Sequence, residues 1–134
     1  MEIHFNIIGV LLMGLALVHV IFPRYFHWKE DLQPLRLINR QMMLVHTFFI
    51  AVVVFLMGLL CVTSARDLIE TRLGRTISLG LGIFWVLRLL VQFFGYSSEL
   101  WRGKRFETAV HIVFSLLWVY LSVVFMGTGL GKLN

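Results

Sequence analysis

Hydrophobic positions along the chain gather in four long segments, and polar residues gather in the short connections between them. A helix that crosses a membrane needs about 20 mainly apolar residues, because each residue adds about 1.5 Å along the axis. The four apolar segments have close to this length and cover residues 5–22, 42–62, 77–96 and 108–127. The pattern therefore predicts four membrane-spanning helices.

The connections between these segments are too short to hold a second domain, so the sequence predicts a single four-span domain over residues 1–134. In lipid, the backbone polar groups must be hydrogen-bonded within the segment, which favours helices. Short connections make successive helices antiparallel neighbours. We therefore expect an all-α fold, an integral membrane four-helix bundle with up-down-up-down topology.

The two prolines predict where helices end and begin. Pro23, followed by Arg24, is expected to end the first span. Pro34 is expected in the first turn of the helix that leads into the second span, because proline is tolerated there. In that case Arg36 and Arg40 would lie one above the other on the helix surface.

Composition supports a membrane protein and excludes several other classes. Hydrophobic residues make up 59% of the 134 residues and charged residues only 14%, whereas soluble domains have about 25% charged residues. The net charge of +5 comes from basic residues that flank the apolar segments. This placement favours contact with anionic lipid headgroups over nucleic acid. Cys61 is the only cysteine, so an intramolecular disulfide is excluded.

The distribution of Lys and Arg predicts the orientation of the chain. With four spans, the loops 23–41 and 97–107 share one side of the membrane and both termini share the other. The two-loop side carries seven basic residues, namely Arg24, Lys29, Arg36, Arg40, Arg102, Lys104 and Arg105. The other side carries four, namely Arg66, Arg72, Arg75 and Lys132. Since basic loops stay cytoplasmic, we expect both loops in the cytoplasm and both termini outside. The membrane is expected to be the cell inner membrane.

A charged residue interrupts the third apolar segment, FWVLRLLVQFF, at Arg88. An arginine at the centre of a spanning helix costs roughly 2.5–3.5 kcal/mol on insertion scales, and such residues often mark functional sites. Gln92 follows four positions later and therefore shares its helix face. Among the acidic residues of the chain, Glu107 is the expected acceptor for Arg88.

Three histidines are predicted at the same membrane face as Arg88. His19 lies about one turn before the end of the first span, and His46 and His111 lie about one turn after the start of the second and fourth spans. Small residues spaced by seven, Ser115, Ser122 and Gly129, predict that the fourth helix packs closely with this face inward. The predicted site consists of Arg88, His46, His111, His19, Gln92, Arg40 and Glu107.

A redox cofactor is the favoured interpretation of this site. Two imidazoles from facing helices can hold the iron of haem b, so we expect His46 with His111 or His19 as ligands, and Arg40 and Arg88 as partners of the propionates. His46 and His111 are also the candidate ligands for copper. A quinone could use the same histidine, arginine and glutamine side chains as donors to its carbonyl oxygens.

Two further functions are compatible with the same residues. Arg88 could hold an anionic solute or a lipid headgroup for transport or sensing, with the histidines titrating near neutral pH. Alternatively, the chain could be a small structural or assembly subunit that contacts other membrane subunits or a second copy of itself. No arrangement typical of a hydrolase or a nucleotide-binding enzyme is present in the sequence, so no reaction is assigned.

Overall fold

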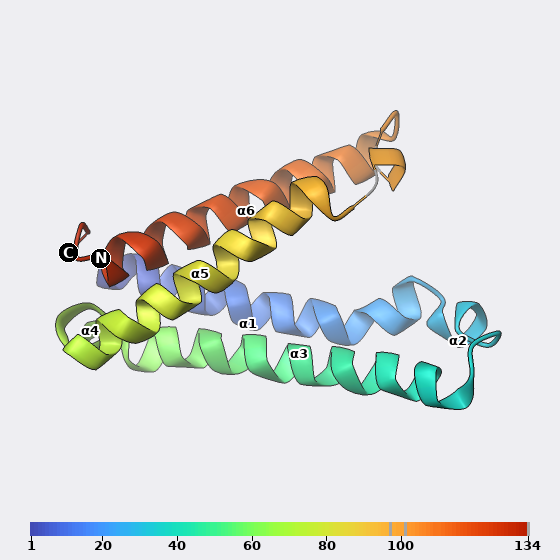
Figure 1. The fold of residues 1–134 in the computed structure, drawn as a ribbon, viewed down its shortest axis with the longest axis horizontal. Helices are drawn as coiled ribbons and strands as arrows, with labels where there is room; N and C mark the ends of the chain where they lie inside the picture. Colours follow the sequence, from blue (N-terminus) through green and yellow to red (C-terminus); the bar gives the residue numbers. More distant parts are fainter. Residues whose placement is uncertain (97, 101, 134) are drawn as a thin grey trace. The chain divides into compact units, whose positions relative to one another are not determined.

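The computed structural model describes all residues except Ser97, Trp101 and Asn134, and the described part of the chain is helical with no strand (Figure 1). Four helices are long and apolar enough to cross a membrane: α1 (Glu2–Tyr25), α3 (Leu37–Thr63), α5 (Arg72–Phe94) and α6 (Arg105–Gly129). Three short helices lie between them: α2 (Trp28–Asp31), α4 (Ala65–Glu70) and the 3-10 helix η1 (Ser98–Leu100). The predicted all-α fold with four long apolar helices is confirmed.

The predicted spans agree closely with the four long helices. The spans 5–22, 42–62 and 108–127 lie inside α1, α3 and α6. The span 77–96 extends two residues beyond the end of α5 at Phe94. The predicted loop 97–107 includes Ser97 and Trp101, which lie outside the described residues.

Both predictions made from the prolines are wrong. Pro23 lies inside α1, which continues to Tyr25, because a proline near the end of a helix removes only one backbone hydrogen bond. Pro34 lies in a turn that the Leu35 N–H closes by donating to the Leu32 carbonyl (3.1 Å). Helix α3 begins three residues after Pro34, and Arg36 occupies its N-cap with an extended backbone. The Arg36 carbonyl accepts from the Arg40 N–H (3.1 Å), so Arg36 lies at the start of α3 rather than within its first turn.

The chain divides into two compact units. One consists of residues 3–65 and contains nearly all of α1 with α2 and α3, and the other consists of residues 1–2 and 66–134 and contains nearly all of α4 with α5, η1 and α6. Each unit holds one antiparallel pair of long helices. That the four spans form one domain stays a prediction.

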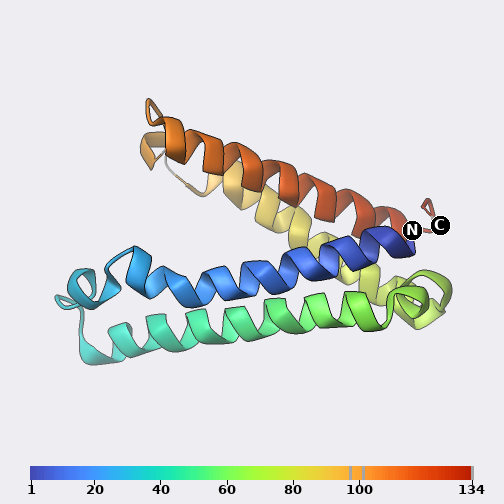
Figure 2. The same cartoon turned by 180° about the vertical axis from the view of Figure 1, so that it is seen from behind.

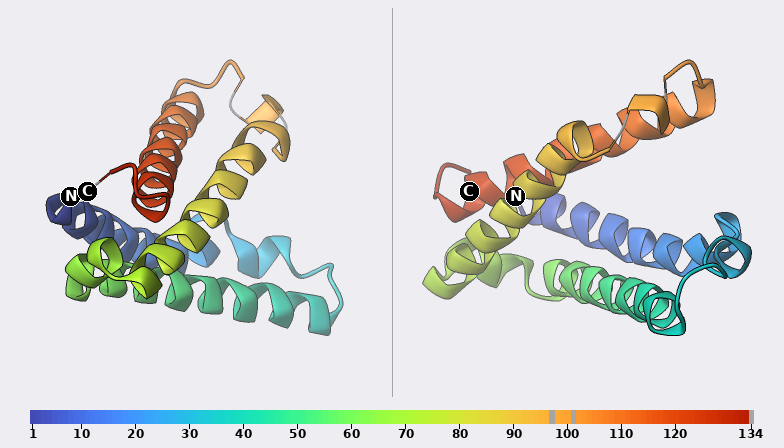
Figure 3. Two further views of the ribbon diagram at one scale, coloured as in Figure 1. Left: turned by 60° about the vertical axis from the view of Figure 1, so that its left-hand side comes forward. Right: turned by 45° about the vertical axis from the view of Figure 1, so that its right-hand side comes forward.

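In the first unit, α1 and α3 run antiparallel (Figures 1 and 2), and α2 lies in the connection between them (Figure 3). The two helices approach closely at Gly9 and Gly58. A Cβ atom on Gly58 would lie 2.6 Å from the Gly9 carbonyl oxygen, and a Cβ on Gly9 would lie 2.6 Å from the Gly58 carbonyl oxygen. Small residues of this kind let membrane helices associate through direct backbone packing.

In the second unit, side-chain hydrogen bonds connect α4 to the start of α5. The Thr71 hydroxyl accepts from the Gly74 N–H (2.9 Å) and donates to the Asp67 carbonyl (2.7 Å). Thr71 is thus the N-cap of α5, since it satisfies one of the N–H groups that have no partner within the helix. Two turns after Thr71, the buried Ser78 hydroxyl donates to the Leu68 carbonyl of α4 (3.2 Å).

Helices α5 and α6 form the second antiparallel pair, and two glycines bring them close together. A Cβ on Gly82 would lie 2.7 Å from the Met126 sulfur, and a Cβ on Gly129 would lie 2.6 Å from the Leu79 Cα. These two contacts fix the register of α6 on α5. The polar residues nearer the η1 end of the pair are positioned by that register.

We predict that Gly9→Val destabilises the chain and that Gly14→Val does not. Valine at position 9 would clash with Val62 and with the Gly58 backbone, whereas a Cβ on Gly14 meets nothing within 4 Å. Overpacking of this kind costs about 1–3 kcal/mol. Thermal unfolding of both variants in the same detergent measures the difference. Equal midpoints for the two variants would contradict the close approach of α1 and α3.

Candidate functional site

Arg88 lies on α5, six residues before the helix ends at Phe94. Its guanidinium is half-buried, and its Nη1 group donates to the Gln92 side-chain oxygen (3.3 Å). The two residues are four apart on one helix, where side chains lie one above the other. Arg88 and Gln92, which were expected to share a helix face, are thus joined by a direct hydrogen bond.

Two aromatic rings provide the other contacts of the Arg88 guanidinium. Its central carbon lies 5.0 Å from the centroid of the Trp118 ring on α6 and 5.6 Å from the centroid of the Tyr96 ring. Both distances are within the range in which an aromatic face attracts a cation, an interaction worth up to about 2 kcal/mol when desolvated. The charge in the third span is therefore held by aromatic faces and an amide.

Gln92 links Arg88 to the fourth span. Its side chain is only 7% exposed, and its nitrogen lies 2.9 Å from Nδ1 of His111 on α6. The amide oxygen accepts from Arg88, so the amide nitrogen donates to His111. Nδ1 of His111 is then the acceptor, and the proton of the neutral imidazole is on Nε2. The three side chains form one hydrogen-bonded chain between two helices.

The ring and the backbone of His111 have further contacts. The ring packs edge-on against Phe93, with centroids 6.0 Å apart and planes at 80°. The Ser115 hydroxyl donates to the His111 carbonyl (2.7 Å). Helix α6 therefore presents the imidazole to α5 in a fixed orientation.

Stacked indole rings form the apolar side of this site. Trp85 on α5 and Trp118 on α6 lie 5.1 Å apart with an angle of 11° between their planes. Both rings are buried, and within the described part of the chain neither indole Nε1–H has a hydrogen-bond partner. We call Arg88, Gln92, His111, Trp85 and Trp118 the Arg88 cluster.

Glu107 has a different position from the one expected. It is exposed in the first turn of α6, and no ion pair joins it to Arg88. Among the described residues, the one salt bridge is between Arg66 and Glu2.

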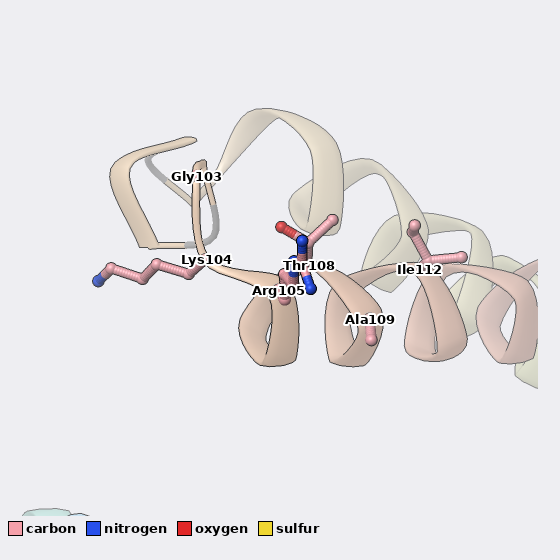
Figure 4. Close-up of a pocket in the computed structure, with 6 residues that line it drawn as sticks. All are labelled: Gly103, Lys104, Arg105, Thr108, Ala109 and Ile112. Carbon is pink, nitrogen blue, oxygen red and sulfur yellow. The ribbon is translucent and has the colours of Figure 1, made fainter.

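Near Glu107, the surface has an open hollow of about 470 Å³ lined by Gly103, Lys104, Arg105, Thr108, Ala109 and Ile112. Figure 4 shows the Lys104 side chain extending away from the others.

The remaining predicted site residues, His19, His46 and Arg40, belong to the other unit. Nδ1 of His19 donates to the Leu15 carbonyl (2.9 Å), and Nδ1 of the exposed His46 donates to the Met42 carbonyl (2.7 Å). Within the described residues, no group of three or more His, Cys, Asp or Glu side chains could hold a metal ion. That these three residues form one site with Arg88 stays a prediction.

Sequence analysis missed the two tryptophans of the Arg88 cluster. Trp85 lies three positions before Arg88, and Trp118 lies seven positions after His111, so each shares a helix face with a predicted site residue. That spacing was a usable signal. In an apolar segment, however, it does not distinguish a ring in contact with the charge from one that faces lipid.

The length and apolar character of its four long helices make this chain a multi-pass membrane protein. No protein-family model, curated protein or solved structure matches it. The chemistry of the Arg88 cluster is therefore the basis on which its function can be inferred.

We predict that Gln92→Leu destabilises the chain by about 1–3 kcal/mol, because a buried hydrogen-bonding group loses its partner. Leucine fills a similar volume but leaves both Arg88 and His111 without the amide. Gln92→Glu is the matched comparison, since its carboxylate still accepts from Arg88 and should retain most of the stability. Unfolding midpoints in one detergent test this expectation. A Gln92→Leu variant as stable as the wild type would show that the hydrogen-bonded chain contributes nothing.

Proposed function

We propose that the chain is a multi-pass membrane protein that binds a quinone-type cofactor at the Arg88 cluster. The observation that carries this proposal is an excess of hydrogen-bond donors within an apolar, aromatic part of the α5–α6 pair. The cluster has more N–H groups than acceptors, and lipid tails offer no acceptor in their place. A ligand that brings oxygen acceptors would satisfy them.

Arg88 and the two indoles supply the donors. A guanidinium has five N–H groups. Among the described residues, the side-chain oxygen of Gln92 is the one hydrogen-bond acceptor of Arg88. The Nε1–H groups of Trp85 and Trp118 are buried without a partner in the described chain. A buried donor without an acceptor costs about 1–3 kcal/mol. The carbonyl oxygens of a quinone could accept from these groups.

The aromatic surroundings favour a flat, uncharged ligand over a hydrated anion. Trp85 and Trp118 are stacked, and Phe114 lies against Trp118 with centroids 5.6 Å apart. An anion would have to lose its hydration shell to enter such surroundings. A quinone ring would lose little hydration on entering the same surroundings.

Haem b is the other cofactor that the sequence favours, with His46 and His111 as ligands. These histidines belong to different units, so the haem hypothesis depends on how α3 and α6 associate in the membrane. An absorption spectrum of protein purified from haem-supplied cells distinguishes the two cofactors, because haem gives an intense Soret band and a quinone does not.

Ligand-dependent thermal stability tests the quinone proposal. We expect a short-chain ubiquinone analogue to raise the unfolding midpoint of the purified protein in detergent. A ligand that binds only the folded state stabilises it by about 2.7 kcal/mol at one hundred times its Kd. Arg88→Gln should fold and should abolish this shift, because it removes the main donor.

Arg72→Gln is the control, since Arg72 is an exposed arginine on the same helix, 16 residues and about 24 Å before Arg88. It should respond to the quinone analogue like the wild type. An unchanged response of Arg88→Gln would overturn the proposal. A shift with small carboxylates or phosphates, and none with the quinone analogue, would favour the anionic-solute function, and co-purified partner chains would favour the assembly function.

From the basic residues of the loops, we also propose that loops 23–41 and 97–107 are cytoplasmic and that both termini are outside. Exposed Gln33 lies in one of these loops and exposed Glu70 lies on α4. In a Cys61→Ala background, a membrane-impermeant maleimide applied to intact cells should label Glu70→Cys and should label Gln33→Cys only after permeabilisation. The reverse pattern would contradict this orientation.

A further inference from the structure

A hollow of about 620 Å³ lies at one end of the α1–α3 pair, within the unit of residues 3–65. The end of α1, the short helix α2 and the start of α3 all contribute to its lining. We call it the α2 hollow. It shares no residue with the Arg88 cluster, so what it binds is independent of the function proposed above.

The α2 hollow is basic. Its charged lining residues are Arg24, Lys29, Arg40 and Glu30, so three cations oppose one carboxylate and the net charge is +2 with His27 neutral. The cations come from three different elements: Arg24 from α1, Lys29 from α2 and Arg40 from α3. Charges that converge from separate helices on one hollow can surround a single anionic group.

Arg40 carries the strongest indication of a missing ligand. Its Nε atom is buried and has no hydrogen-bond partner among the residues that the structure describes. A guanidinium stays protonated in proteins, so the Nε–H group remains a donor at any ordinary pH. A charged donor left without an acceptor is costly. Arg40 also lines the hollow, so an anionic oxygen bound there could accept from its guanidinium.

The backbone between α1 and α2 helps to form the hollow. His27 has φ of 55°, in the left-handed region that residues with a side chain rarely adopt. This conformation turns the chain directly after α1, so that Trp28 and Lys29 line the same hollow as Arg24.

The position of the hollow suggests the kind of anion. It lies where α1 ends at Tyr25 and α3 begins at Leu37, and both helices are long and apolar enough to span a membrane. The ends of spanning helices lie at the level of the lipid headgroups, where tyrosine and tryptophan are enriched. Trp28 lines the hollow, and Tyr25, the last residue of α1, directly follows the lining residue Arg24. Basic pockets between spanning helices bind the phosphates of anionic lipids.

We propose that the α2 hollow binds a phosphate group, supplied by the headgroup of an anionic phospholipid, and that Arg40 is its principal ligand. Arg24 and Lys29 complete the positive surroundings. Trp28 provides an apolar surface beside the glycerol region of the lipid.

The test uses the full chain, delipidated in a non-ionic detergent, and measures the unfolding midpoint against ligand concentration. The probes are dihexanoyl phosphatidylglycerol, dihexanoyl phosphatidylcholine and inorganic phosphate. We expect phosphatidylglycerol to give a saturable rise in the midpoint and phosphatidylcholine to give little. Inorganic phosphate should be weak; if it stabilises the protein as strongly and competes with phosphatidylglycerol, the phosphate chemistry is upheld and a free anion is its source.

Arg40→Gln and Arg36→Gln form a matched pair, since both remove one positive charge from the same segment. Arg40 lines the hollow, whereas Arg36 is exposed and does not line it. Loss of a charged hydrogen bond should weaken phosphatidylglycerol binding by about tenfold or more in Arg40→Gln. Arg36→Gln should weaken it by no more than about threefold, as for a screened surface charge.

Arg40→Lys retains the charge and lacks the Nε–H group, so it should bind with intermediate affinity. If Arg40→Gln fails to fold, Arg24→Gln serves in its place and should also weaken binding more than Arg36→Gln. Equal losses in the Arg36 and Arg40 variants, or equal binding of phosphatidylcholine and phosphatidylglycerol, would overturn the proposal.

Discussion

The charge of Arg88 cannot be removed by deprotonation, and lipid tails cannot solvate it, so α5 and α6 have to supply its surroundings themselves. They do so with the Gln92 amide and the rings of Trp118 and Tyr96. Because Trp118 is on α6, the full set of these contacts forms only when the two helices are paired. The same requirement holds for Gln92, whose amide reaches His111 across the helix pair.

This polar arrangement depends on packing contacts toward the opposite end of the two helices. Gly82 lies against Met126, and Gly129 lies against Leu79. Backbone contact at these two points sets the rotation and height of α6. A helix turned by one residue, about 100°, would carry Trp118 and His111 away from α5 together. Small residues in one half of the pair thus specify where the functional groups meet in the other half.

Most of the fold could be predicted from the sequence, because the length of an apolar segment is a direct consequence of membrane thickness. The helix ends were harder to predict. Pro23 is tolerated inside α1, and Pro34 lies in the turn that precedes the N-cap residue Arg36. For the site, the spacing of Arg88 and Gln92 was sufficient to place them on one helix face, where the structure joins them by a hydrogen bond. Glu107 was expected to pair with Arg88 because the two side chains have opposite charges. In the structure, the faces of aromatic rings contact the cation instead. In a hydrophobic pattern, such rings are not distinguished from other apolar residues.

The absence of an ion-pair partner for Arg88 among the described residues also has an electrical consequence. A full charge that crosses the membrane field gains or loses about 2.3 kcal/mol per 100 mV. Arg88 lies six residues from the end of α5, about 9 Å along an apolar core of about 30 Å. Roughly a third of the field, about 0.7 kcal/mol per 100 mV, then acts on the guanidinium relative to the surface. Per 100 mV, this energy changes the equilibrium constant for placing the charge at that depth, relative to the surface, by about threefold.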